Sequence, residues 1–194
     1  MIEDFFTLKT IGDDNYLYFK GANVEVDSFY KGQKIWENRI RNGLSNGVYR
    51  KFEKGVKIQE GRYIDDKKEG KWLEWYDNGE FYSEENYLNG KINGTLKRYY
   101  FNETLALEAN YLNGKKNGDF VKYYDQEHLP PHGPENRSSQ GRYINDEEEG
   151  YWKYWYINGV VKKEGSYVNG YPEGEWIERY ENGEIKKITS YHTL

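Results

Sequence analysis

The chain has 194 residues, the length of one ordinary domain or of one modest repeat array. Aromatic residues make up 18% and charged residues 31%, and the absence of cysteine excludes disulfide bonds and thiolate metal sites. The formal net charge of −5 argues against nonspecific nucleic-acid binding, which needs clustered Lys and Arg, and would suit a basic partner.

The first residues, MIEDFFTLKTIGDD, lack a basic start followed by an apolar run, so no signal peptide is predicted. No window of about 20 apolar residues is available to span a membrane. A cytoplasmic location is therefore expected. Residues 15–19 (NYLYF) are typical of a strand, and residues 30–37 resemble residues 76–84 of the later repeats. We expect residues 1–39 to form an N-terminal cap with a degenerate repeat, because repeat arrays need atypical ends.

Residues 40–194 form a repeat array. One glycine recurs at spacings of 23, 24, 24, 32 and 24 residues: Gly47, Gly70, Gly94, Gly118, Gly150 and Gly174. A ring or a leucine follows two residues later: Tyr49, Trp72, Leu96, Phe120, Trp152 and Trp176. A second column is all tyrosine: Tyr63, Tyr87, Tyr111, Tyr143, Tyr167 and Tyr191. A fixed period of this length indicates units that cover one another's apolar surface.

Glycine and Asn-Gly pairs recur too often for a helix with a useful face, and the runs between them are rich in Tyr, Trp, Ile and Val. The pattern predicts an all-β fold: an elongated, twisted, single-layer antiparallel meander of about six to seven β-hairpin repeats. Tight turns are expected at Asn78-Gly79, Asn158-Gly159 and Asn182-Gly183. Longer turns are expected to end in the repeated glycine, as in residues 65–70.

Strand alternation separates the rings into two sets. Trp72 and Tyr76 share one face, and their column is regular, which indicates internal stacking. Leu73 and Trp75 share the other face, where the aligned residues vary. A single-layer sheet cannot bury both faces, so the variable aromatics are either an intramolecular cover or a surface for a partner. The partner-binding candidates in this column are Trp75, Tyr99, Tyr123 and Trp155.

The period breaks once, where residues 126–140 (QEHLPPHGPENRSSQ) are predicted to form an insertion loop off the sheet. His128 and His132 lie in this segment, but Pro130 and Pro131 between them forbid the helix that would align them. A solvated loop is favoured over a metal site, and no metal is expected.

A turn of four acids is either a solvated turn or an electrostatic contact for a basic partner, and it is kept as a second set of partner-binding candidates: Asp146, Glu147, Glu148 and Glu149. The repeated glycines are not followed by a phosphate-binding Lys-Ser/Thr pattern. No Ser-His-Asp or Cys-His constellation can be argued, and no carboxylate pair stands out from the repeats. We therefore expect no catalytic residue, no cofactor and no enzyme activity.

The repeat has the pattern Tyr-x-x-Gly-x-x-x-Gly-x-Trp-x-x-x-Tyr, followed by Asn-Gly and then Glu-Gly-x-Tyr. Good copies begin at Tyr167 and at Tyr87. This pattern resembles the MORN repeat in its bacterial variant form, over roughly residue 37 to the C-terminus. The sequence departs from it at Asn102-Glu103, where Asn-Gly is expected, and at the insertion.

The resemblance implies a single twisted sheet of hairpins with a groove lined by the repeated aromatics. Bacterial chains of such repeats are frequently antitoxin-like or immunity-like proteins that bind and block a cognate toxin. Others scaffold proteins or touch phospholipid. The resemblance thus implies a non-enzymatic protein whose partner is a toxin, with basic character suggested by the acidic charge. The alternatives are a structural scaffold or membrane-associated adaptor and, from a different class, a carbohydrate-binding module that stacks sugars on Tyr and Trp.

Overall fold

The computed structural model describes residues 7–11, 14–18, 24–30, 33–125 and 136–192. These residues contain strands and turns and no helix, so the predicted all-β antiparallel meander is confirmed. The chain divides into two compact units, residues 1–91 and residues 92–194. Each unit is described by itself.

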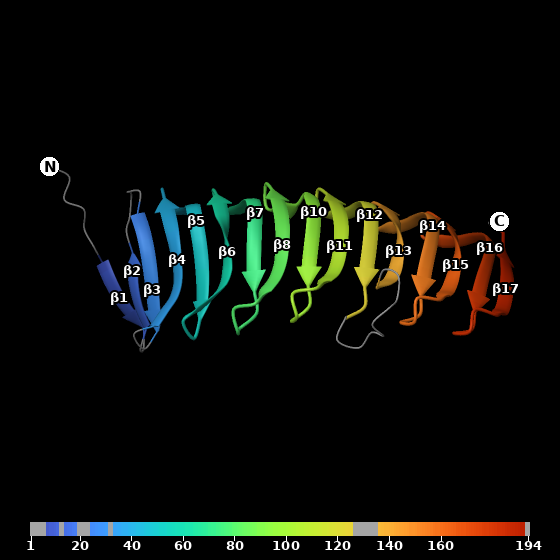
Figure 1. The fold of residues 1–194 in the computed structure, drawn as a ribbon. Coiled ribbons are helices and arrows are strands. Elements are labelled where there is room, and N and C mark those ends of the chain that lie inside the picture. The colour runs from blue at the N-terminus through green and yellow to red at the C-terminus, as the bar shows by residue number, and fades with distance from the viewer. Residues whose placement is uncertain (1–6, 12–13, 19–23, 31–32, 126–135, 193–194) are drawn as a thin grey trace. The chain divides into compact units, whose positions relative to one another are not determined.

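The first unit is a meander in which every strand pairs antiparallel with its neighbours in the chain (Figure 1). The expected strand at 15–19 is present as β2, although Phe19 lies outside the described residues. The strands are β1 (Thr7–Ile11), β2 (Asp14–Tyr18), β3 (Val24–Tyr30), β4 (Gln33–Arg41), β5 (Leu44–Glu53), β6 (Val56–Ile64), β7 (Lys67–Trp75) and β8 (Phe81–Leu88).

The second unit continues the same pattern of consecutive antiparallel pairs. The short β9 (Lys91–Ile92) lies at the division between the units. The other strands are β10 (Gly94–Tyr99), β11 (Leu105–Leu112), β12 (Lys115–Tyr123), β13 (Arg137–Ile144), β14 (Glu147–Trp155), β15 (Val161–Val168), β16 (Tyr171–Arg179) and β17 (Ile185–Tyr191).

The expected insertion connects β12 to β13, two strands that pair directly. Residues 126–135 of it, including both histidines, lie outside the described residues. Residues 137–140, the end of the expected loop, belong to β13.

The positions of the tight turns differ from the prediction. The two-residue turns, with both residues at positive φ, are Asn42-Gly43, Lys54-Gly55, Asp65-Asp66, Asn89-Gly90, Asn113-Gly114, Asn145-Asp146 and Asn169-Gly170. At Asn78-Gly79 only the glycine has positive φ, within a longer connection closed by the bond from Tyr76 N–H to the Glu80 carbonyl. The asparagine there has another role, because its Oδ1 accepts the Glu80 N–H at 3.0 Å. At Asn102-Glu103 it is likewise Glu103 that has positive φ.

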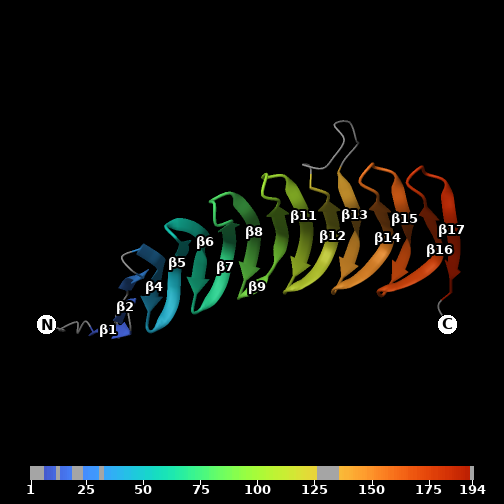
Figure 2. The same cartoon turned by 90° about the horizontal axis from the view of Figure 1, so that it is seen from below.

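The sequence predicted that the repeated glycine ends a turn. In the structure this glycine lies within a strand instead. Gly70, Gly150 and Gly174 have φ of 68°, 68° and 67° within β7, β14 and β16. Glycine tolerates this conformation at no steric cost, so it allows the strand to bend. The strand pairings also shift register at these bends, between Glu60 and Arg62 for example. Figure 2 shows the strong curvature of β12, β14 and β16.

The regular ring column forms the core of each unit, as predicted. In the first unit Trp72 packs edge-on against Tyr63 and Tyr87, with ring centroids 4.9 and 6.1 Å away. In the second unit Trp152 lies 5.1 Å from Tyr143 and 6.2 Å from Tyr167, which in turn lies 4.8 Å from Trp176. The three indoles are only 1–2% exposed. Since each aromatic side chain buries roughly 150–250 Å², this stack compensates for the scarcity of aliphatic residues. We call this side of the strands the ring face.

Each buried indole packs directly against the backbone of a glycine. A Cβ added to Gly61, Gly141 or Gly165 would lie 2.1–2.3 Å from the ring of Trp72, Trp152 or Trp176 respectively. The Trp152 Nε1–H donates to the Arg142 carbonyl at 3.2 Å, and Trp72 and Trp176 make the equivalent bond. The glycine therefore makes room for the ring, and the hydrogen bond satisfies its buried N–H.

Tyrosine hydroxyls join consecutive repeats of the second unit. Tyr100 donates to the Tyr123 carbonyl at 2.7 Å, and Tyr124 donates to the Trp155 carbonyl at 2.7 Å. Tyr156 donates to the Arg179 carbonyl at 2.9 Å. One residue per repeat thus provides a side-chain bond to the backbone of the next repeat.

Candidate interaction surface

A column of exposed aliphatic side chains lies on the side opposite the ring face. Each member follows a tyrosine of the core column, and successive residues of a strand point to opposite sides of the sheet. Tyr143 is buried, for instance, whereas Ile144 is 42% exposed. The members are all 42–51% exposed, and we call them the aliphatic column: Ile64 and Leu88 in the first unit, and Leu112, Ile144 and Val168 in the second.

The aliphatic column was missed in the sequence analysis, although the sequence contains a signal for it. An aliphatic residue follows Tyr63, Tyr87, Tyr111, Tyr143 and Tyr167 in every case. Isolated exposed aliphatic residues are common on protein surfaces and need no explanation. Recurrence after five of the six core tyrosines is less common, and within each unit it places these side chains on the side of the strands opposite the ring face.

The residues paired with the aliphatic column extend it. Ile144 is the Cα partner of Glu147, and Val168 is the Cα partner of Tyr171. Tyr171 is 74% exposed, the largest exposed fraction among the large hydrophobic side chains described. In the second unit, therefore, the column is bordered by an exposed ring and by one of the four predicted acidic candidates.

The other acidic candidates have partners inside the chain. Asp146 Oδ1 accepts the Lys116 N–H at 2.7 Å, and Glu149 Oε2 accepts the Asn169 N–H at 3.0 Å. Glu148 Oε1 accepts the Tyr143 hydroxyl at 3.2 Å. The first unit uses its turn in the same way, since Asp66 accepts the Ser45 N–H and Glu69 accepts the Asn89 N–H. Glu148 thus holds a core hydroxyl and the other carboxylates satisfy backbone donors of a neighbouring hairpin, which leaves the exposed Glu147 as the acid best placed to contact a partner.

The four aromatic candidates each end a strand: Trp75, Tyr99, Tyr123 and Trp155. All are partly buried. Trp75 packs edge-on against Phe81 at 6.0 Å, and Lys57 Nζ lies 4.3 Å from its ring centroid. Strand β14 begins at Glu147 and ends at Trp155. At about 3.3 Å per residue this separates the two by roughly 25 Å, so the structure does not bring the aromatic and acidic candidates together.

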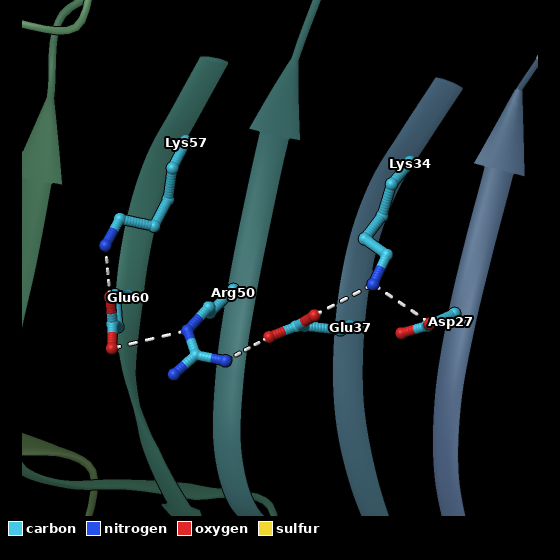
Figure 3. A network of polar contacts seen from close by, with 6 residues as sticks. All are labelled: Asp27, Lys34, Glu37, Arg50, Lys57 and Glu60. Carbon is cyan, nitrogen blue, oxygen red and sulfur yellow. Dashed lines mark hydrogen bonds and ion pairs between the residues drawn. The ribbon is translucent and has the colours of Figure 1, made fainter. Parts of the chain in front are cut away.

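Charged side chains occupy the middle of the strands between these two ends. In the first unit a network runs through six residues from β3 to β6 (Figure 3). Lys34 Nζ lies 2.9 Å from Asp27 and 3.0 Å from Glu37, and Arg50 contacts both Glu37 and Glu60. Lys57 closes the network on Glu60. The surface is therefore an aliphatic band and an aromatic band with ion pairs between them.

These ion pairs shift the pKa values of their carboxyl groups. The Arg50 hydrogen bond, helped by Lys34, holds the pKa of Glu37 below its usual value, and the Lys57 hydrogen bond does the same for Glu60. In the second unit, burial would raise the pKa of Glu164. Hydrogen bonds from Tyr151 at 2.8 Å and Arg179 at 2.6 Å outweigh that effect, so the pKa is lowered.

The described residues contain neither a metal-binding cluster nor a membrane-spanning helix. They contain no group of three or more His, Cys, Asp or Glu side chains that could hold a metal ion. No helix in the described part of the chain is long and apolar enough to cross a membrane.

Fold and surface together define an all-β hairpin-repeat protein with a filled ring face and an open opposite face. Four segments match the family model described as MORN repeat variant: residues 68–89, 92–113, 148–169 and 172–192. Each covers one hairpin, namely β7–β8, β10–β11, β14–β15 and β16–β17. These four hairpins are thus similar to the MORN repeat variant. No curated protein gave a significant match.

Proposed function

We propose that this chain is a non-enzymatic protein-binding repeat protein, and specifically an antitoxin or immunity protein that binds a cognate toxin domain and blocks it. The observation that carries the proposal is the aliphatic column, which lies on the face that the ring core leaves open. MORN repeats act as protein-binding or scaffold repeats, in line with this use of the open face.

The aliphatic column suits a protein partner on energetic grounds. Burial of apolar surface stabilises a complex by roughly 25 cal/mol per Å² before the cost of association. The hairpins already fix the backbone of these residues, so little further ordering is needed on binding. Tyr171 adds an aromatic side chain of the kind that is enriched at interface hot spots.

Charge favours a basic toxin. The chain has a net charge of −5, and Glu147 lies beside the column at Ile144. Charges at the border of an interface mainly speed association and exclude partners of like charge. The toxin surface is therefore expected to pair apolar residues with Lys or Arg at its border.

The test is co-expression with the product of the adjacent gene, followed by affinity capture and measurement of cell survival. We expect the chain to bind that product and to protect the cells. Leu112→Asp and Ile144→Asp should weaken capture and protection, because each places a charge within the apolar contact. Val48→Asp is the matched control, since Val48 is a comparably exposed aliphatic residue outside the column.

Three outcomes would overturn the proposal. The first is that no protein is captured and cells are not protected. The second is that both column variants protect as well as the Val48→Asp control while all three remain folded by circular dichroism. The third is flotation of the purified chain with anionic vesicles, which would favour the membrane-associated adaptor instead.

A further inference from the structure

A depression of about 290 Å³ lies in the first unit, where β5, β6 and β7 approach the ends of their hairpins. Ligand pockets usually have volumes of about 300–1,000 Å³, so this one suits a single side chain better than a free ligand of ordinary size. Its lining combines one indole, one aliphatic side chain, three carboxylates, one amide and one ammonium: Trp75, Ile58, Glu53, Glu74, Asp77, Gln59 and Lys51.

The carboxylates of the depression are not neutralised by cations of the chain. Glu53 and Asp77 are exposed and make no ion pair among the described residues. Glu74 is held by neutral donors, since it accepts Gln59 Nε2 at 2.6 Å and the Ser83 hydroxyl at 3.5 Å. Lys51 is the one cation among the lining residues, so the depression has an excess of negative charge.

The ring of Trp75 already accepts a cation from within the chain. Lys57 Nζ lies 4.3 Å from its centroid and also contacts Glu60. A cation within about 6 Å of an indole face is attracted by the negative charge of that face. The lining thus offers an indole surface together with unpaired carboxylates, which is the combination that recognises a cationic side chain.

We propose that this depression is the anchor site for an arginine side chain of a protein partner. The inference rests on the proposed function and adds the residue type that the partner inserts. The guanidinium stacks on Trp75, the side-chain methylenes lie against Ile58, and Glu53 and Asp77 accept its N–H groups. Arginine fits better than lysine because its group is planar, weakly hydrated and able to stack and donate at once.

The second unit contains a matched site that lacks the acids. Trp155 ends β14 as Trp75 ends β7. At the aligned positions, however, Tyr154 replaces Glu74, Ile157 replaces Asp77 and Tyr124 replaces Glu53. Trp155 is therefore an internal control, which shows whether the peptide binds to an indole that has no carboxylates at these positions.

The experiment uses the full chain labelled with ¹⁵N and follows the indole N–H resonances of its six tryptophans. Trp75→Phe assigns the Trp75 resonance, and Trp155→Phe assigns that of Trp155. The probe is the peptide acetyl-Gly-Arg-Gly-amide, and the control probe carries norleucine in place of arginine. We expect the Trp75 resonance to shift saturably with the arginine peptide only, while the Trp155 resonance stays in place.

Two variants sharpen the test. Glu53→Gln combined with Asp77→Asn removes two exposed acceptors and should raise the peptide dissociation constant about three- to tenfold, as expected for exposed ion pairs. Lys51→Gln removes the one cation among the lining residues and should lower the dissociation constant about two- to fivefold. A merely structural role for these residues would not produce changes of opposite sign.

The inference is overturned if the Trp75 resonance does not move, if Trp155 responds equally, or if the norleucine peptide gives the same shift. These measurements need no toxin, so a negative result would reject the arginine anchor without rejecting the proposed function. Conversely, capture of a toxin that is unaffected by Glu53→Gln with Asp77→Asn would preserve the proposed function and reject the anchor.

Discussion

In the ring core, the size of each ring matches the size of the small residue on which it packs. Gly61, Gly141 and Gly165 lie against tryptophan, and in each case a Cβ would come closer than 2.5 Å to the ring. Where the glycine is replaced by Ala109, the paired ring is the smaller Phe120. The chain therefore contains both solutions to one packing problem, a large ring on glycine and a smaller ring on alanine.

This complementarity predicts the effect of Gly165→Ala. The added methyl would lie 2.3 Å from Cδ2 of Trp176, so the ring must move from its place on the backbone. We expect a loss of about 1–3 kcal/mol in the free energy of unfolding, the usual cost of overpacking a core. Urea denaturation followed by circular dichroism measures the loss.

The control is a double-mutant cycle with Trp176→Phe, which recreates the pair seen at Ala109 and Phe120. Gly165→Ala should cost less in the Trp176→Phe background than in the wild-type chain, because the smaller ring leaves room for the methyl. Equal costs in the two backgrounds would mean that the close approach to Trp176 does not limit stability at this position.

The ring core could be predicted because its signal is large and regular. Trp72, Trp152 and Trp176 recur with the glycines, and alternation along the strand places them on one face. The aliphatic column is a weaker signal, since one Ile, Leu or Val per repeat is easily taken for part of a core strand. Asp146 and Glu149 were predicted to contact a partner because a charge run does not show which backbone donor it faces. Only the structure reveals the Lys116 and Asn169 N–H groups beside them.

At the scale of the strand and turn, the two kinds of connection have different chemistry. A two-residue turn such as Asn169-Gly170 needs two residues at positive φ, which Asn, Asp and Gly tolerate best. In the longer connections asparagine acts by accepting an N–H, as Asn158 accepts that of Val160 at 3.0 Å. Both connections contain Asn-Gly, so the dipeptide alone could not predict which of them is the tight turn.

The tyrosine bonds between repeats lead to a second prediction. Tyr156→Phe removes the donor to the Arg179 carbonyl and leaves ring packing in place. We expect the free energy of unfolding to fall by about 0.5–1.5 kcal/mol, the net value of a typical hydrogen bond. Chemical denaturation of the full chain measures the change.

Tyr180→Phe is the matched control for Tyr156→Phe. Tyr180 occupies the same position in its repeat, but it is 50% exposed and its hydroxyl makes no hydrogen bond among the described residues. Its replacement should change stability by less than about 0.5 kcal/mol, the usual range for surface substitutions. Equal losses in the two variants would show that the bonds to the next repeat add no stability.

At the scale of the whole chain, the dense ion pairs predict how stability depends on pH. Glu37, Glu60 and Glu164 have pKa values lowered by hydrogen bonds from their cationic or phenolic partners. A group with a lowered folded-state pKa stabilises the protein above its unfolded pKa, which is about 4.3 for Glu. That stabilisation is lost as pH falls further, through the folded-state pKa.

We therefore expect the urea midpoint to be nearly constant between pH 7 and pH 5 and to fall steeply below about pH 4. Glu164→Gln should lower the midpoint at pH 7 and reduce its fall at acid pH, because Glu164 is well buried between Arg179 and Tyr151. Glu147→Gln, at the exposed first position of β14, should leave the profile close to that of the wild-type chain. A Glu164→Gln profile parallel to that of the wild type would contradict this assignment.

Tyr143 and Ile144 are neighbours in the chain, but different structural constraints act on their side chains. The tyrosine is held by the packing of the rings, whereas the isoleucine is 42% exposed on the opposite side of the strand. Descendants of this gene can therefore vary the codons of the aliphatic column while those of the ring core are kept, and duplication of one hairpin copies both. Recognition of new partners can diversify in such a lineage while the scaffold stays under purifying selection.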